Sequence, residues 1–402
     1  MLVLLARALH GQAPPPEERP DDEPYHDFRL QPLEYLGPAG EGPDPASLTE
    51  VPIGWFGPSD PAQPLYGDLW TATSLAVEEV NEAGGLDGLP VRLIPRWSEN
   101  PWGTGVGQIA RMVHEDQVLA ILGSVDGPGT HLAEQVVVKA RLPLVSPVST
   151  DESVNLAGVP WMFSVAPGDH LWAPLVASGM LEMIGDGNFA LLATTDHDSR
   201  LAAKELVGAL AALERGPALR IDLQPGTMDL STSLGRIGDD SPSAALVIAS
   251  APDSATLIRA LRQRGFAGPI FGGPQLGRRL FMASAGAAAE GVTLPLLFDS
   301  TDQASEAAKF AQRFQARTGF PPDWAAAHTY DATRLLLESI RRAGLSRAAI
   351  RQALVELSPW HGVVGLIEWD PTGQSLRPVT RLAMIRQGNI VPMPDPRNPR
   401  TD

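Results

Sequence analysis

A segment rich in hydroxyl groups, Ser-Pro-Val-Ser-Thr at positions 146–150, follows an apolar run, Leu142–Val145, that predicts a buried strand. The segment itself, which includes Ser149 and Thr150, contains no acid, base or metal ligand. Hydroxyls next to free backbone amides can hydrogen-bond an anion such as a carboxylate without any proton transfer. The segment therefore predicts a binding loop, with an exposed hydroxyl turn as the alternative.

A second polar segment, Thr-Thr-Asp-His-Asp-Ser-Arg at 194–200, places Asp196, His197 and Asp198 after another predicted strand. This composition fits an acid–base pair, a ligand contact or a solvated loop, and we favour the last two. The chain has no G-x-S-x-G elbow, no phosphate loop and no H-E-x-x-H motif. It also lacks cysteine, and its eight histidines show no metal-type spacing. We therefore expect no catalytic residue, no metal and no cofactor.

A glycine-containing loop carries Gly123, Gly127 and Gly129 after a predicted strand. Its spacing is not the G-x-G-x-x-G of dinucleotide-binding proteins, and Pro128 removes one amide that a pyrophosphate would use. The loop therefore argues against a nucleotide site.

The elements that must position these loops form two series of short apolar strands alternating with helices. The strands are predicted at 51–56, 91–95, 118–122 and 142–145, and then at 162–165, 189–193, 219–223, 245–249 and 269–272. Near-continuous apolar strands separated by helices predict parallel sheets covered on both faces. Two series predict two doubly wound α/β lobes. Ligands of such sheets lie beyond the carboxyl ends of the strands, which is where the hydroxyl and Asp-His-Asp segments fall.

The composition sets limits on the class of protein. The chain has 402 residues, enough for two domains, with 44% hydrophobic residues and a net charge of −16. Such acidity disfavours nucleic acid as a partner, because phosphate contacts need a concentrated basic face. No uncharged apolar run reaches the length of a transmembrane helix.

The N-terminal residues 1–50 are predicted to be a leader and linker without stable structure. The apolar start at residues 2–6, followed by Gly-Gln-Ala at 11–13, suggests a signal peptide, but the apolar run is short and no basic residue precedes it. We interpret this as a truncated signal peptide, with a disordered leader as the alternative. Residues 14–50 are rich in Pro and acids, and 396–402 form a tail.

Taken in order, several segments resemble type I periplasmic binding proteins of the leucine/isoleucine/valine-binding family, the substrate-binding components of branched-chain amino acid ABC transporters. The segments are VPIGWFGPSDPAQPLYGDLW, VLAILGSVDGPGTHLAEQVVVKARLPLVSPVSTDESV, LIRALRQRGFAGPIFGGPQLG, AAAHTYDATRLLLESIRRAG and GVVGLIEWDPTGQ. Together they span about residues 51–392. No single segment would identify the family, but their combined order does.

The resemblance implies two Rossmann-like lobes joined by three hinge crossovers, a fold that closes on a ligand like a Venus flytrap. The crossovers would lie near 166–169, 291–294 and 361–364. Lobe 1 would then comprise residues 51–167 plus 293–362, and lobe 2 residues 168–292 plus 363–395.

The resemblance also implies a set of ligand contacts in the cleft between the lobes. The family's loop tyrosine corresponds to Tyr66, and its receptor for the ligand carboxylate corresponds to Gly127, Val148 and Thr150. The family's glutamate that receives the ligand ammonium aligns with Gln275. The full predicted set is Tyr66, Ser124, Asp126, Gly127, Val148, Ser149, Thr150, Asp198, Ser250 and Gln275.

The chain departs from the family at several of these positions. A glycine stands at 127 where the family has a hydroxyl, and Asp198 and Ser250 stand near positions of family aromatics. A neutral Gln275 cannot balance a buried ammonium, because an uncompensated buried charge costs several kcal/mol. An acid at position 126, 198 or 253 would have to take that role.

By resemblance, the chain is expected to be an extracytoplasmic or periplasmic solute-binding protein. It would capture a small polar ligand, an amino acid or a related amide or carboxylate, and act as a monomer with an ABC permease. A ligand-sensing receptor or regulator of the same fold is the alternative, and a nucleotide-dependent enzyme a remote one.

Overall fold

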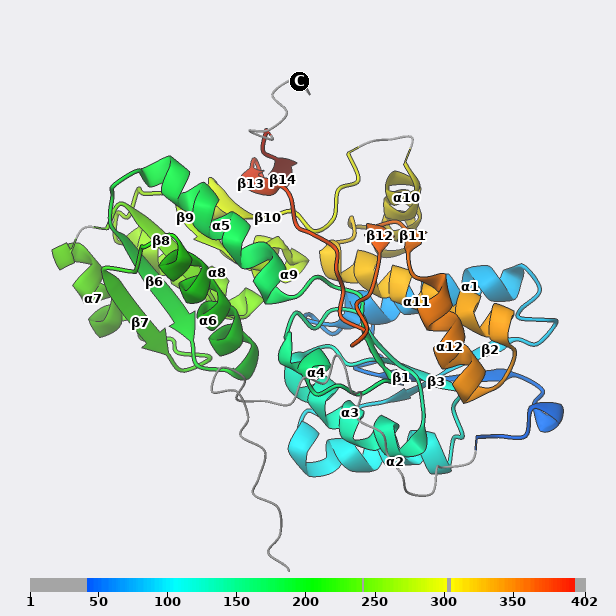
Figure 1. The fold of residues 1–402 in the computed structure, drawn as a ribbon. Helices are drawn as coiled ribbons and strands as arrows, with labels where there is room; N and C mark the ends of the chain where they lie inside the picture. The colour runs from blue at the N-terminus through cyan, green and yellow to red at the C-terminus, as the bar shows by residue number, and fades with distance from the viewer. Residues whose placement is uncertain (1–41, 241, 302–304, 395–402) are drawn as a thin grey trace, which may run out of the picture.

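The computed structural model describes residues 42–240, 242–301 and 305–394 and shows two α/β lobes side by side (Figure 1). The predicted signal peptide and most of the predicted leader fall within residues 1–41, which are outside the described residues. The predicted tail, 396–402, is also outside them. The last part of the predicted linker contains a short 3-10 helix, η1 (Pro45–Ser47), before the first strand. None of the helices in the described part is long and apolar enough to cross a membrane.

The first lobe contains a five-stranded parallel sheet. Its order is β2 (Val91–Arg96), β1 (Val51–Phe56), β3 (Ala120–Gly123), β4 (Leu144–Ser146) and β5 (Met162–Ser164). One face packs on α1 (Gly67–Glu82), α10 (Glu306–Thr318), α11 (Trp324–Ala343) and α12 (Arg347–Leu357). The other face packs on α2 (Val106–His114) and α3 (Gly127–Ala140), with η2 (Pro101–Gly105) and α4 (Ser153–Leu156) as short additions. Burial on both faces explains why the inner strands β1 and β3 are almost entirely apolar, whereas the edge strand β2 contains exposed residues.

The second lobe contains a seven-stranded mixed sheet. Its order is β14 (Asn389–Pro392), β13 (Leu382–Arg386), β10 (Val292–Pro295), β9 (Ile270–Gly272), β8 (Ala244–Ile248), β6 (Phe189–Thr194) and β7 (Leu219–Leu223). Helices α5 (Asp169–Ile184) and α6 (His197–Ala212) cover one face. The other face is covered by α7 (Ser231–Asp240), α8 (Ala251–Gln263) and α9 (Arg279–Ala285), with η3 (Pro274–Gly277) before α9 and η4 (Gly286–Ala289) after it. The strands from β7 to β10 are parallel, whereas β13 and β14 run antiparallel.

The chain crosses between the lobes three times. The first crossing links β5 to α5, where the sequence places it, but the other two lie later than predicted. The second crossing is predicted near 291–294, with lobe 1 resuming at 293. Instead, residues Val292–Pro295 form β10, which pairs with β9 and β13 and places alternate side chains in the second lobe's core. The chain returns only after Pro295.

The third crossing also lies beyond its predicted place at 361–364. Strands β11 (Trp360–Gly362) and β12 (Gly365–Ile367) form a hairpin there that packs on the first lobe's core. The buried carboxylate of Asp331 accepts hydrogen bonds from the amides of Val363 (2.9 Å) and Val364 (2.8 Å), which ties the hairpin to α11. The chain therefore reaches the second sheet only between this hairpin and β13.

A buried histidine in α11 gives the fold a predictable acid sensitivity. Arg377 Nη1 donates to Nε2 of His328 (3.3 Å), so Nδ1 carries the proton and donates to the Trp324 carbonyl (2.7 Å). Burial and the Arg377 charge lower the pKa of His328 to about 3. An unfolded histidine titrates near pH 6.5, so the unfolded chain binds the extra proton, and this contribution to stability is lost as pH falls from about 6.5 to 3.

We expect His328→Gln to reduce the fall in the free energy of unfolding between pH 6.5 and 4, measured by denaturant titration. The slope against pH, rather than the absolute stability, is the readout, because the substitution also alters packing. Identical slopes for both proteins would show that His328 is not held neutral.

Candidate functional site

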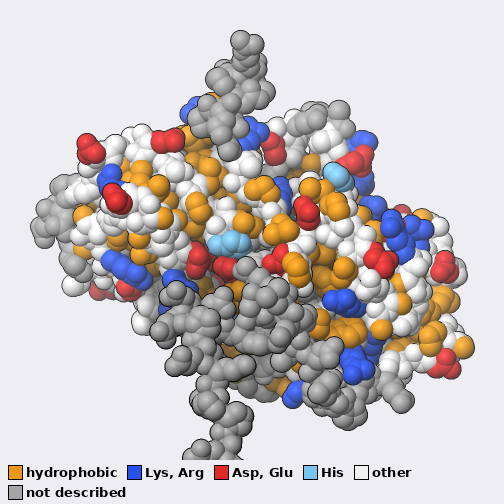
Figure 2. All heavy atoms as spheres, viewed as in Figure 1, with side chains coloured by type: hydrophobic (Ala, Val, Ile, Leu, Met, Phe, Trp, Pro, Cys, Tyr) orange, Lys and Arg blue, Asp and Glu red, His pale blue; other side chains and the backbone are white. Residues whose placement is uncertain are grey.

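A cavity of about 280 Å³ lies between the two lobes and is lined by both. The first lobe contributes the start of α1, the loops after β3 and β4, and the start of α11. The second lobe contributes the starts of α5, α6 and α8 and the segment after β9. These are the carboxyl ends of the strands, where ligands of doubly wound sheets bind. Figure 2 shows acidic side chains and a histidine gathered along the boundary between the lobes.

Helix caps explain how the loops are held at this edge. Asp126 accepts from Gly129 N at the start of α3, Asp196 from Ser199 N at the start of α6, and Ser250 from Asp253 N at the start of α8. A side-chain oxygen at this position satisfies an amide that the helix leaves free. The caps thus fix short turns between each strand and its helix, and they face the opposite lobe.

Most of the predicted site residues line the cavity. They are Tyr66, Asp126, Val148, Thr150, Asp198, Ser250 and Gln275. Three do not. Ser124 is buried and donates to the Asp126 carbonyl, which fixes its own loop, and Ser149 is buried with no hydrogen-bond partner for its hydroxyl in the described part of the chain. Gly127 lies at the boundary between the lobes instead.

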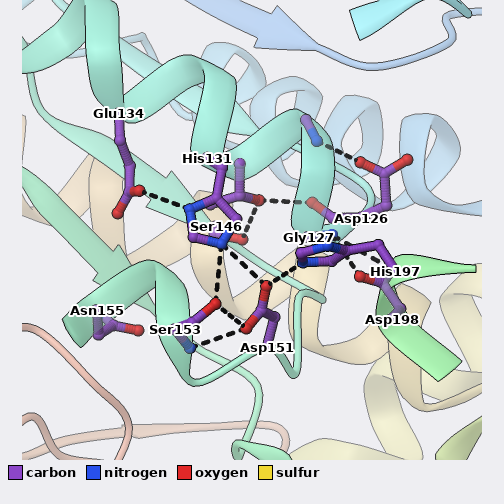
Figure 3. Close-up of polar contacts among 12 residues, drawn as sticks. Asp126, Gly127, His131, Glu134, Ser146, Asp151, Ser153, Asn155, His197 and Asp198 are labelled. Atoms are coloured by element: carbon purple, nitrogen blue, oxygen red, sulfur yellow. Dashed lines mark hydrogen bonds and ion pairs between the residues drawn. The ribbon is translucent and has the colours of Figure 1, made fainter. Parts of the chain in front are cut away.

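The amide of Gly127 binds an acid of the protein itself. It donates across the cleft to both oxygens of Asp198, at 3.2 and 3.3 Å (Figure 3). Similarly, the Thr150 hydroxyl hydrogen-bonds the buried carboxyl of Asp169. Two of the three positions that the family resemblance assigned to a ligand carboxylate, Gly127 and Thr150, therefore bind the chain's own carboxyls.

The cavity carries an excess of acidic groups. Burial, followed by the nearby charge of Asp126, raises the pKa of Asp198 well above its usual range, and burial also raises the pKa of Asp126. Burial raises the pKa of Asp169 to about 7. The pKa of the Tyr66 phenol is raised by burial and by the same two acids, Asp126 and Asp198. Each shift reflects first the burial of the group, which disfavours its charged form, and for Asp198 and Tyr66 also the charge of neighbouring acids.

The remaining walls are largely apolar. Trp172 and Trp324 lie on opposite sides of the lobe boundary, and their indole nitrogens are engaged by Asp169 Oδ1 (2.9 Å) and the Pro274 carbonyl (2.9 Å). Their rings are thus fixed and present apolar surface. The arrangement can hold a small molecule with an apolar part and a polar, positively charged part.

Arg278 is a site residue that sequence reasoning missed. Its buried guanidinium crosses from the second lobe to Asp323 Oδ1 (2.9 Å), Asp68 Oδ1 (3.2 Å) and the Leu65 carbonyl (2.5 Å). Burial alone would lower the pKa of Arg278, but Asp323 and Asp68 outweigh it and raise the pKa. No local sequence pattern identifies Arg278 as a site residue, because its acidic partners lie more than 40 residues away along the chain in both directions.

The three polar residues of the Asp-His-Asp segment go in different directions. Asp196 caps α6, Asp198 binds Gly127, and His197 Nε2 meets Asp151 Oδ2 of the other lobe at 2.8 Å. They therefore do not form the acid–base pair that the sequence left open. Two of the three connect the lobes.

Gly127 leaves no room for a side chain when the lobes are closed. A Cβ there would lie 2.4 Å from Asp198 Oδ1 and 2.9 Å from Asp151 Oδ2. We expect Gly127→Ala to prevent full closure and to weaken ligand binding about tenfold or more, while the unliganded chain keeps its melting temperature within a few degrees. Calorimetry and thermal unfolding check this, with Gly107→Ala, a helix position with open space, as the control. Unchanged affinity would mean that Asp198 does not approach Gly127 in the bound form.

Comparisons with known proteins bear on the family and the fold of this chain. The model of a family described as periplasmic binding protein matches residues 50–389. An amino acid binding protein of Pseudomonas aeruginosa is 22% identical over 329 residues, which is 81% of this chain and 88% of that protein.

Solved structures show the same fold. A leucine binding protein, LivK, from Thermotoga maritima superposes with a TM-score of 0.77 at 22% identity, covering 85% of this chain and 97% of that one. The branched-chain amino acid transporter substrate binding protein LivJ from Streptococcus pneumoniae, in complex with isoleucine, gives 0.77 at 20% identity, covering 86% and 99%. The two-lobed α/β fold predicted from the sequence is confirmed.

Proposed function

Since this chain belongs to the periplasmic binding protein family, we propose that it is an extracytoplasmic solute-binding protein. It encloses a small polar ligand between its lobes and delivers it, as a monomer, to the permease of an ABC transporter. The protein binds its ligand without transforming it. The sequence features weighed for catalysis support this reading, because Asp196, His197 and Asp198 are used for capping and for contacts between the lobes.

The observation that carries the proposal is the cavity between the lobes. Its volume of about 280 Å³ is near the lower end of the range for ligand pockets and suits a molecule of amino-acid size. It lies at the strand ends of both sheets, so a bound ligand would join the lobes and closure would remove it from water.

The ligand class follows from the charges. A free carboxylate finds Gly127 and Thr150 already bound to Asp198 and Asp169, and it would meet an excess of negative charge. Asp126 and Asp198 would stabilise a ligand ammonium, which is the role that the neutral Gln275 cannot fill. We therefore propose a small amine or an amino acid amide, with its apolar part against Trp172, in preference to a free amino acid.

A matched pair of probes tests this directly. We expect leucinamide to raise the melting temperature more than leucine, and calorimetry to give it at least tenfold higher affinity. At 100 times its Kd a ligand stabilises the folded chain by about 2.7 kcal/mol. Small amines, carboxylates, amides and nucleotides complete the screen.

The outcomes separate the two parts of the proposal. Preferential binding of leucine or of a simple carboxylate would contradict the assigned ligand charge but retain the binding function. Stabilisation by a nicotinamide dinucleotide alone, with no response to any small metabolite, would instead contradict the binding function. Ligand-dependent binding to a purified permease would separate transport from sensing.

A further inference from the structure

Three side chains that could bind a metal converge where the lobes meet. They are His131 on α3, Asp151 after β4 and His197 at the start of α6, which we call the seam cluster (Figure 3). Both imidazoles point Nε2 at the same oxygen, Asp151 Oδ2, at 3.1 Å from His131 and 2.8 Å from His197. All three candidate ligand atoms lie within 4.8 Å of one another. Two lobes therefore contribute to one polar centre outside the cavity lining.

Neighbouring groups hold two of these side chains in place. His131 Nδ1 lies 3.3 Å from Glu134 Oε2, so it donates to that carboxylate and aims Nε2 at Asp151. The other oxygen of Asp151 accepts from Ser153 N (2.8 Å) and Ser153 Oγ (2.6 Å), and Ser153 Oγ is also 3.0 Å from His131 Nε2. A carboxylate that orients the second nitrogen of a histidine is a common support of metal ligands.

The charge of the centre favours a cation. Asp151 and Glu134 are buried, and Glu134 Oε1 is buried with no hydrogen-bond partner among the described residues. With neutral imidazoles, the two buried carboxylates that contact His131 lack a compensating positive charge, which is costly away from water.

The ligand set and spacing match a transition metal. Two imidazole nitrogens and one carboxylate oxygen suit zinc and its neighbours rather than calcium or magnesium. Tetrahedral zinc places neighbouring ligand atoms about 3.3 Å apart. The observed 2.8 and 3.1 Å between Asp151 Oδ2 and the imidazole nitrogens lie near that spacing, and the two nitrogens, within 4.8 Å of each other, would have to approach one another to complete the set.

We propose that His131, Asp151 and His197 bind one divalent transition-metal ion of the zinc class, with a fourth position left to water. Because His197 belongs to the second lobe and the other two to the first, the ion joins the lobes and favours the closed form. By linkage, a ligand that closes the lobes and the ion then raise each other's affinity equally.

A metal-free arrangement of the same groups is the competing explanation. Burial lowers the pKa of His131, but hydrogen bonds with Asp151 and Glu134 outweigh it and raise the pKa to about 10. A proton on the imidazole could therefore bridge the same atoms, and metal must displace it. The test has to separate these two arrangements.

The test uses chelator-stripped full-length protein and metal alone. We expect Co²⁺ to bind one ion per chain with the visible absorption of a tetrahedral site, and Zn²⁺ to displace it. His197→Ala and His131→Ala should each weaken binding by roughly 100-fold, and Glu134→Gln by about 10- to 100-fold. His197 is about one-third exposed, so its replacement does not endanger folding.

His170→Ala is the matched control, because His170 also reaches an acid of the other lobe, Glu152 (3.3 Å), but lies outside the cluster. It should bind Co²⁺ as the wild type does. Absence of stoichiometric Co²⁺ binding, or equal affinity in His197→Ala, would overturn the site and leave the protonated arrangement.

A second measurement tests the bridging role. Zn²⁺ should reduce the radius of gyration of the unliganded wild type in solution scattering, and it should not do so for His197→Ala. Metal binding without compaction would overturn the proposed effect on closure. Neither experiment includes the small-molecule ligand, so failure here is independent of the proposed transport function.

Discussion

Replacing Arg278 with Met is expected to weaken ligand binding by roughly 100- to 1,000-fold. The guanidinium is buried between Asp68 and Asp323 of the first lobe, while Arg278 itself belongs to the second. Removing one partner of a buried ion pair leaves uncompensated charge and costs about 3–5 kcal/mol. When the lobes separate, water can reach the two acids. The substitution therefore raises the free energy of the closed form more than that of the open form.

The measurement is ligand affinity by calorimetry beside the melting temperature of the unliganded chain. Arg278→Lys should lie between wild type and Arg278→Met, because an ammonium cannot reproduce the fork that reaches two acids and the Leu65 carbonyl. Arg317→Met is the control. Its partner Glu78 is exposed and lies in the same lobe, so a change below about 1 kcal/mol is expected. A large loss of melting temperature with unchanged affinity would show that Arg278 supports folding rather than closure.

Replacing Asp198 with Asn is expected to reduce the affinity for leucinamide by about 100-fold or more. The carbonyl oxygen of Asn can keep the bond to the Gly127 amide, so the change removes charge with little loss of geometry. A buried charge pair that loses one partner costs about 2–5 kcal/mol. Asp126→Asn should act in the same direction, because both acids line the cavity.

Ligand charge supplies the control for this second experiment. A neutral molecule of similar shape should bind the Asp198→Asn variant as well as or better than the wild type, since the carboxyl no longer has to be desolvated. The two substitutions should not be additive if both acids contact one ammonium. Equal loss for charged and neutral ligands would contradict the assignment of a cationic ligand.

Much of the fold could be predicted because local patterns encode it. Strands Val51–Phe56 and Leu219–Leu223 have the predicted bounds. The first is an apolar run buried on both faces, and the second is an edge strand in which buried and exposed residues alternate. The apolar periodicity predicts helices at 131–139, 201–214 and 255–264, but α3, α6 and α8 each begin four residues earlier. Their caps, Asp126, Asp196 and Ser250, extend each helix into the loop that was expected to precede it.

The sequence alone therefore determined the two α/β series and the edge at which a ligand site must lie, because hydrophobic periodicity and the alternation of strands and helices along the chain are local properties. It also supplied Tyr66, Asp126 and Asp198 as candidates. Tertiary structure decided which groups remain free for a ligand. Asp198 meets Gly127 across 71 positions of sequence, and Arg278 reaches Asp68 across 210. These contacts form only when two separately folded lobes come together, so no sequence pattern within either lobe predicts them.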